Sequence, residues 1–109
     1  MAWLVHDDVV LASLEVPTTR RDRARGLLGR DEFDEAMLLQ PCRSVHTVGM
    51  RFPIDVAVCD ADLVVLRVVT LRPNRVTRPS WRGRAVVEVP AGTFAHWGIG
   101  PGDQLEVRA

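Results

Sequence analysis

Hydrophobic residues recur mostly at every second position along this chain, and runs with that spacing are typical of β-strands. Clusters of Pro, Gly, Asn and Asp interrupt the runs, as turns between short strands do. The stretch 63–71 is rich in Val and apolar on both faces, which favours a strand inside a sandwich. The pattern predicts strands at residues 3–5, 9–16, 36–39, 63–71, 84–89 and 104–108.

A helix is predicted at residues 20–28. Thr19 can cap it, Asp22 lies three residues later in the position of a capping box, and Gly29 follows the last helix former. Its arginines are expected to form a solvated face, since charge runs on a helix are usually solvated. Its buried side would be supplied by Ala24, Leu27 and Leu28.

Many short strands, Gly and Pro turns and one short helix near residues 20–28 predict an all-β protein. We expect a compact antiparallel sandwich or barrel, with one further helical turn near residues 94–97. The chain has 109 residues, a length at which one core forms, so residues 1–109 are predicted to be a single domain.

The stretch 42–60, CRSVHTVGMRFPIDVAVCD, holds most of the candidate chemistry. If it is extended, its even positions form an apolar face that includes His46 and Met50. The odd positions, which point the other way, include Thr47, Arg51 and Asp55.

Two arrangements of this stretch would make a site. In the first, the odd face is functional: Thr47, Arg51 and Asp55 border a pocket, joined by Trp81 or an arginine of the 72–78 loop. The even face is then plain core.

In the second arrangement, His46 and Met50 open into the cavity. This requires a bend or bulge between Gly49 and Pro53 that changes the alternation. We favour this arrangement, because a His and a Met beside Pro and Gly are cheaper to expose than to bury.

Composition narrows the class of protein. The formal net charge is zero, with 14 basic and 14 acidic residues, so overall charge favours neither nucleic acid nor a membrane as partner. No stretch resembles a signal peptide or a membrane span, and we expect a cytoplasmic protein. Cys42 and Cys59 have neither a zinc spacing nor the number needed for a disulfide scaffold, which favours a reducing compartment.

Three segments together resemble the bacterial and archaeal domain-of-unknown-function family 192: RDRARGLLGR, SVHTVGMRFPIDVAVCD and VVEVPAGTFAHWGIGPGDQLEV, in that order. The resemblance spans nearly the whole chain and implies a compact β-sandwich of jelly-roll type, with no established activity. The family pattern is matched at Arg23, Gly26, Leu27, Arg30, His46, Met50, Pro53, Asp55, Glu88, Gly92, Gly102 and Asp103.

Two positions depart from that pattern. A turn that usually has Gly after an acidic residue reads Asp62-Leu63 here, and Ala36 stands where Gly is common. Either departure would alter a loop at the site without disturbing the fold.

We predict a non-catalytic binding or accessory module whose partner is an unidentified small molecule or a protein. The expected ligand-binding residues are His46, Thr47, Met50, Arg51, Asp55 and Trp81. The alternative is an enzyme with a cleft centred on His46 and Asp55, since an imidazole held by a carboxylate is the usual general base. No nucleophile elbow, HExxH or phosphate loop supports catalysis, so we assign no catalytic residue.

A third hypothesis is binding of an anionic polymer. Residues 67–84 contain six arginines around Trp81 and no acidic residue, a combination that contacts phosphates and stacks a base. The candidate anion-binding residues are Arg72, Arg75 and Arg78. We rank nucleic acid below a small molecule because the chain is neutral overall.

Metal binding is not predicted. Cys42, His46 and Met50 are four residues apart, so on a regular strand successive members would lie about 13 Å apart, too far for common ligation. We therefore expect no metal and no cofactor. The sequence indicates no oligomeric state.

Overall fold

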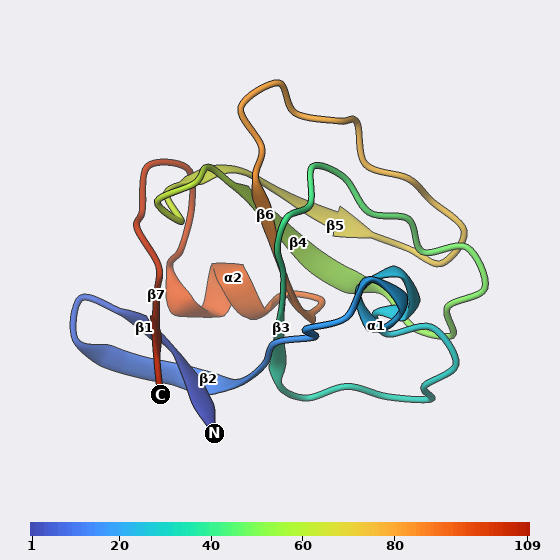
Figure 1. Cartoon of the computed structure of the whole chain (residues 1–109), viewed down its shortest axis with the longest axis horizontal. Helices are drawn as coiled ribbons and strands as arrows, with labels where there is room; N and C mark the ends of the chain where they lie inside the picture. Colours follow the sequence, from blue (N-terminus) through green and yellow to red (C-terminus); the bar gives the residue numbers. More distant parts are fainter.

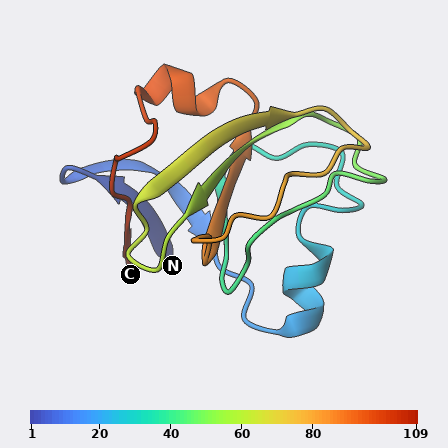
Figure 2. The same cartoon turned by 90° about the horizontal axis from the view of Figure 1, so that it is seen from above.

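The computed structural model describes residues 1–109 and is mainly β. Seven strands form one sheet, and two short helices lie on opposite sides of it (Figures 1 and 2). The strands are β1 (Ala2–His6), β2 (Val9–Glu15), β3 (Ala36–Leu39), β4 (Ile54–Cys59), β5 (Val65–Leu71), β6 (Ala85–Pro90) and β7 (Glu106–Arg108). The helices are α1 (Arg20–Arg25) and α2 (Thr93–Trp97).

The strand order is β5-β4-β6-β3-β2-β1-β7. All neighbouring pairs are antiparallel except β2 and β3, which pair in parallel through Leu14 with Ala36 and Glu15 with Met37. The expectation of a purely antiparallel sheet is wrong at this pair, because α1 and the following loop carry the chain back before β3 begins. The finer description as a sandwich or jelly roll stays a prediction.

The two ends of the sheet meet. Val64 and Gln104 form an antiparallel bridge, and the Leu105 amide donates to the Leu63 carbonyl at 2.9 Å. The Val65 amide donates to the Asp103 carbonyl at 2.8 Å. These bonds join the start of β5 to the segment before β7, so the sheet curls round and part of each edge is paired.

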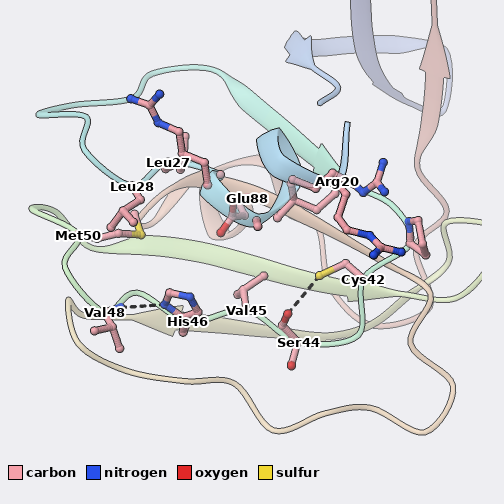
Figure 3. A pocket seen from close by; sticks show the side chains of 16 residues that line it. Arg20, Leu27, Leu28, Cys42, Ser44, Val45, His46, Val48, Met50 and Glu88 are labelled. Atoms are coloured by element: carbon pink, nitrogen blue, oxygen red, sulfur yellow. Dashed lines mark hydrogen bonds between the residues drawn. The ribbon is translucent and has the colours of Figure 1, made fainter. Parts of the chain in front are cut away.

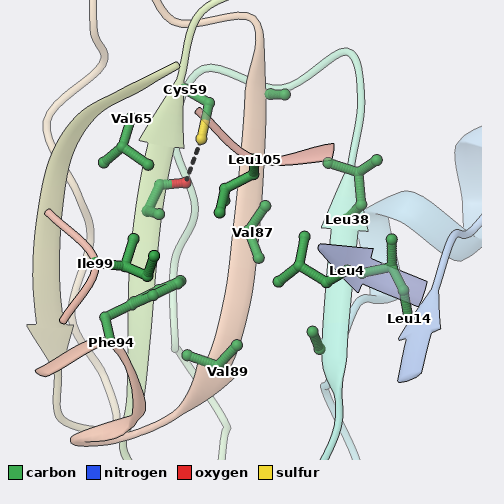
Figure 4. Close-up of a cluster of buried hydrophobic side chains, with 13 residues drawn as sticks. Leu4, Leu14, Leu38, Cys59, Val65, Val87, Val89, Phe94, Ile99 and Leu105 are labelled. Carbon is green, nitrogen blue, oxygen red and sulfur yellow. Dashed lines mark hydrogen bonds between the residues drawn. The ribbon is translucent and has the colours of Figure 1, made fainter. Parts of the chain in front are cut away.

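Buried side chains form two clusters, one on each face of the central strands. On β4 every residue is buried, with Ala57 and Cys59 in one cluster and Val56 and Val58 in the other. The first cluster includes Phe94 of α2 (Figure 4). The second faces α1 and the 40–53 segment, and its buried members are Leu27, Phe33, Met37, Leu39, Val45, Met50, Ile54, Val56, Val58, Leu71 and Val86.

Helix α1 begins as the sequence predicts but ends early. The Thr19 side chain accepts a hydrogen bond from the Asp22 amide at 3.0 Å, which confirms the cap. The helix stops at Arg25, because Gly26 adopts φ 50° and ψ −125°, a conformation that only Gly adopts without strain. Of the three residues expected on the buried side, only Leu27 is buried; Ala24 and Leu28 are exposed.

The expected helical turn near residues 94–97 is confirmed as α2. Neither helix is long and apolar enough to cross a membrane.

The central stretch is extended only from Ile54 onward. Between Gln40 and Pro53 the chain is irregular apart from a single bridge between His46 and Val76, and Gly49 has φ 81°. The predicted two-residue alternation is therefore wrong before β4, since the turn at Gly49 breaks it. The bend required by the second sequence-based arrangement is present.

Candidate functional site

A cavity of about 450 Å³ lies between α1 with its following turn and the 41–50 segment (Figure 3). Side chains from β3 and β6 contribute to it as well. Its apolar lining includes Leu27, Leu28, Leu39, Val45, Val48 and Met50. Its ionisable lining consists of Arg20, Arg23, Arg25, Cys42, His46 and Glu88.

Glu88 is the buried polar group of this cavity. It lies in β6 on the same face as Val86, and it is only 3% exposed. Its Oε1 atom is fully buried and has no hydrogen-bond partner. Burial raises the pKa of the Glu88 carboxyl to about 7, because an apolar environment disfavours the charged form.

Gly26 brings the backbone close to that carboxyl. A Cβ atom built on Gly26 would lie 3.7 Å from Glu88 Oε1. The turn after α1 therefore covers the carboxyl without a side chain between them. Across the cavity, Gly49 likewise lets the backbone approach a side chain closely, since a Cβ atom there would lie 3.1 Å from a methyl group of Leu28.

His46 and Cys42 come from the 41–50 segment. His46 is exposed, and its Nδ1 atom accepts a hydrogen bond from the Val48 amide at 3.3 Å, which places the proton of the neutral ring on Nε2. The Cys42 thiol donates to the Ser44 carbonyl at 3.1 Å. Burial, and to a lesser extent the charge of Glu88, raise the pKa of the Cys42 thiol.

The cavity has a charged end and a mainly apolar end. In Figure 3, Arg20 lies near Cys42 at one end and Glu88 lies in the middle. Leu28, Val48 and Met50 lie at the other end, with His46 beside Val48. Arg20 and Arg25 form no ion pair, whereas Arg23 donates to the Thr18 carbonyl at 3.1 Å.

Of the six predicted ligand-binding residues, only His46 and Met50 line the cavity. Thr47 is fully buried: its hydroxyl donates to the Arg72 carbonyl at 2.6 Å and accepts from the Arg75 amide at 2.9 Å. It therefore holds the 72–75 loop in place. The expectation that Thr47 faces a pocket is wrong, because the loop packs onto it.

Asp55 is also an internal structural residue. Its carboxylate accepts hydrogen bonds from the Thr70 hydroxyl at 2.6 Å and from the Phe94 amide at 3.2 Å, and the residue is 2% exposed. These bonds join β4 to β5 and to α2. The predicted cleft pairing His46 with Asp55 is not formed, because the carboxylate already has partners in the core.

The remaining predicted residues lie outside the cavity. Arg51 is exposed and forms an ion pair with Asp31. Trp81 is 90% exposed. The candidate anion-binding residues Arg72, Arg75 and Arg78 are exposed in the loop after β5.

No three His, Cys, Asp or Glu side chains among the 109 residues gather as metal ligands would. Cys42, His46 and Met50, whose spacing in the sequence argues against a shared metal, do line one cavity. The Cys42 thiol, however, remains hydrogen-bonded to its own segment and carries a raised pKa. A thiolate ligand is thereby disfavoured.

A family profile described as "DUF192: Uncharacterized ACR, COG1430" matches residues 3–107. The chain belongs to this family. No curated protein matches the sequence. The DUF192 chain is similar to the crystal structure of a protein of unknown function from Novosphingobium aromaticivorans, with a TM-score of 0.79 and 22% identity over 96% of this chain and 82% of that one.

It is also similar to the crystal structure of a "putative transcription regulator" from Sinorhizobium meliloti, with a TM-score of 0.81 and 22% identity. That match covers 97% of this chain and 91% of the other. At this level of identity the two likenesses support the fold alone.

The positions that match the DUF192 pattern fall into two groups. One group lines the cavity: Arg23, Gly26, Leu27, His46, Met50 and Glu88. Other positions stabilise the fold, as Asp55 does through Thr70 and as Asp103 does by accepting from the Gly100 amide at 2.8 Å. The departure at Leu63 lies in the β4–β5 turn, where Leu63 has φ 62°; it does not line the cavity.

Glu88 was not among the residues expected to form a site. The signal for it was present in the sequence, because Glu88 is the only acidic residue in a strand whose other positions are nearly all apolar. A carboxylate is rarely fully buried without a partner, so this placement indicates a special environment.

Proposed function

We propose that this protein is a non-catalytic small-molecule-binding module and that the cavity beneath α1 is its binding site. The observation that carries the proposal is Glu88 Oε1, a fully buried acceptor without a hydrogen-bond partner beside an apolar cavity. A buried acceptor left unsatisfied costs about 1–3 kcal/mol. A ligand N–H or O–H group that reaches Glu88 recovers part of that cost.

The apolar lining supplies the rest of the binding free energy. Leu28, Val48 and Met50 form one end of the cavity, and burying apolar ligand surface against them contributes about 25 cal/mol per Å². The volume of about 450 Å³ lies within the range of ligand pockets, roughly 300–1,000 Å³. Half of the lining residues are hydrophobic, and polar groups such as Glu88 and Arg20 can fix the orientation of a ligand, as in small-molecule sites.

The chemistry of the lining favours binding over catalysis. A nucleophilic Cys needs a lowered pKa, and the pKa of the Cys42 thiol is raised by burial. A catalytic His needs an orienting partner, but the Asp55 carboxylate accepts hydrogen bonds from the Thr70 hydroxyl and the Phe94 amide instead. A binding function therefore has more support than an enzyme centred on His46 and Asp55.

An uncharged fluorescent probe tests this proposal. Phenylnaphthylamine has an apolar body and one N–H donor, and its emission rises in apolar sites. We expect saturable binding to the wild type, and a loss of affinity of about tenfold, or about 1.4 kcal/mol, in Val48→Trp, which fills the cavity.

Val76→Trp is the matched control. Val76 is exposed, lies opposite His46 in the bridge and does not line the cavity. It should bind phenylnaphthylamine like the wild type. Equal affinities in Val48→Trp and Val76→Trp would contradict the proposed site.

The exposure of Trp81 favours a second candidate function, binding of an anionic polymer. Trp81 is 90% exposed beside the exposed Arg78 and Arg82. Such a loop can stack a base and contact phosphates. Retention on heparin that falls with salt and disappears in the Arg75→Ala/Arg78→Ala variant would support this function; retention unaffected by the two substitutions would exclude it.

A further inference from the structure

We infer that the ligand of this cavity is an amphipathic organic anion, with an apolar body, a hydrogen-bond donor for Glu88 and an acidic head group near Arg20. The inference rests on the proposed function and names the chemical class of ligand. It follows from the charges that line the cavity, from the arginines that lack partners, and from the separation of polar and apolar residues along it.

The lining carries an excess of positive charge. Arg20, Arg23 and Arg25 are permanently charged, and Glu88 is the only acidic residue that lines the cavity. The pKa of Glu88 near 7 keeps part of the population uncharged at neutral pH. A cationic ligand would be repelled by three guanidinium groups, whereas an anion would be attracted.

Arg20 is free to contact a ligand. Only three arginines form ion pairs: Arg30 donates to both oxygens of Glu15 at 2.9 and 2.8 Å, Arg108 pairs with Glu106 at 2.9 Å, and Arg51 pairs with Asp31. Arg20 is exposed. Arg20 forms no ion pair and lines the cavity. A guanidinium group has the planar donor geometry that binds carboxylate, sulfonate or phosphate oxygens.

The cavity is organised along one direction. Arg20 and Cys42 lie at one end, Leu28 and Met50 lie at the other, and Glu88 lies between the ends (Figure 3). An amphipathic anion can place its head at Arg20 and its tail between Leu28 and Met50. Its donor then meets the acceptor that the protein itself leaves unpaired.

Two probes with the same apolar body test the inference. Anilinonaphthalenesulfonate carries an acidic head, and phenylnaphthylamine is its uncharged parent; both have one N–H donor. We expect the wild type to bind the sulfonate more tightly. In Arg20→Gln the ratio of the two affinities should fall about threefold or more, a change typical of one partly exposed ion pair.

Arg21→Gln is the matched control, because Arg21 is the next residue of α1, is exposed and does not line the cavity. It should leave the ratio unchanged. Equal falls in Arg20→Gln and Arg21→Gln, or no preference for the sulfonate in the wild type, would overturn the inference while phenylnaphthylamine binding still supports the site. Failure of both probes to bind would overturn the proposed function as well.

Discussion

Glu88 Oε1 lies 3.7 Å from the point where a Cβ atom on Gly26 would be placed. The backbone turn after α1 therefore closes over a carboxyl group of β6 without giving it a hydrogen bond. The turn therefore shields Glu88 Oε1 from solvent, while Glu88 still lines the cavity and its unpaired oxygen can accept a hydrogen bond from a ligand there.

Substituting Gly26→Ala should destabilise the protein and weaken phenylnaphthylamine binding. Gly26 has φ 50°, and holding a non-Gly residue in such a region costs about 1–3 kcal/mol. The added methyl group also contacts Glu88. Chemical denaturation measures the loss. Gly100→Ala is the control, since nothing lies within 4 Å of its Cβ position; equal stability of both variants would contradict the account.

Glu88 should make stability depend on pH. Its pKa is raised from 4.5 to about 7 in the folded protein, so the folded state holds the proton more tightly than the unfolded chain. Its contribution to stability is fully present below about 4.5 and is lost as pH rises through about 7. The full shift corresponds to about 3 kcal/mol as an order of magnitude.

Comparison of the wild type with Glu88→Gln isolates this contribution from other carboxyl groups. As pH rises from 5 to 8, the wild type should lose stability relative to Glu88→Gln, because the buried Glu88 carboxyl ionises and Gln does not. Urea denaturation at several pH values provides the measurement. A difference that stays constant over this range would mean that Glu88 is not buried as described.

Substitution of Asp55 should affect stability and not binding. Asp55→Asn weakens the two hydrogen bonds that the buried Asp55 carboxylate accepts, from the Thr70 hydroxyl and the Phe94 amide, and should lower stability by about 1–3 kcal/mol. Thr70→Val, which removes one of these bonds, should show a smaller loss. Under native conditions phenylnaphthylamine affinity should remain as in the wild type. A selective loss of affinity with unchanged stability would restore the His46/Asp55 cleft.

The two cysteines should differ in reactivity. Burial and the charge of Glu88 raise the pKa of Cys42, and burial raises the pKa of Cys59 to about 12. Iodoacetamide should therefore modify Cys42 more slowly than a thiol in the unfolded chain, and Cys59 hardly at all. Saturating phenylnaphthylamine should slow Cys42 further, since Cys42 lines the cavity. Peptide mapping by mass spectrometry separates the two; unchanged Cys42 labelling would contradict ligand binding there.

The sequence predicts the mainly β fold and the start of α1 well, because both depend on local signals. Thr19 and Asp22 form the expected cap, and the apolar run 63–71 contains β5. The end of α1 was missed, since Gly26 stops the helix three residues before the expected Gly29. Local patterns do not predict which strands pair when they lie far apart in the sequence, as β4 and β6 do.

The site was predicted only in part. His46 and Met50 line the cavity as the favoured arrangement expects, but Thr47 and Asp55 are buried by partners that come from the loop after β5, β5 itself and α2. Glu88 comes from a strand that is far from His46 in the sequence. Glu88 and the 41–50 segment come together only through tertiary packing, which the spacing of hydrophobic residues does not predict.

The central claim is that the cavity beneath α1 binds a small molecule, and intermolecular nuclear Overhauser effects test it most directly. In a sample saturated with phenylnaphthylamine, the probe protons should show contacts to the methyl groups of Met50 and Leu28, which line the cavity. They should show none to Ile99 and Leu105 in the cluster on the opposite face. Contacts to that opposite cluster, or to Trp81 alone, would contradict the claim.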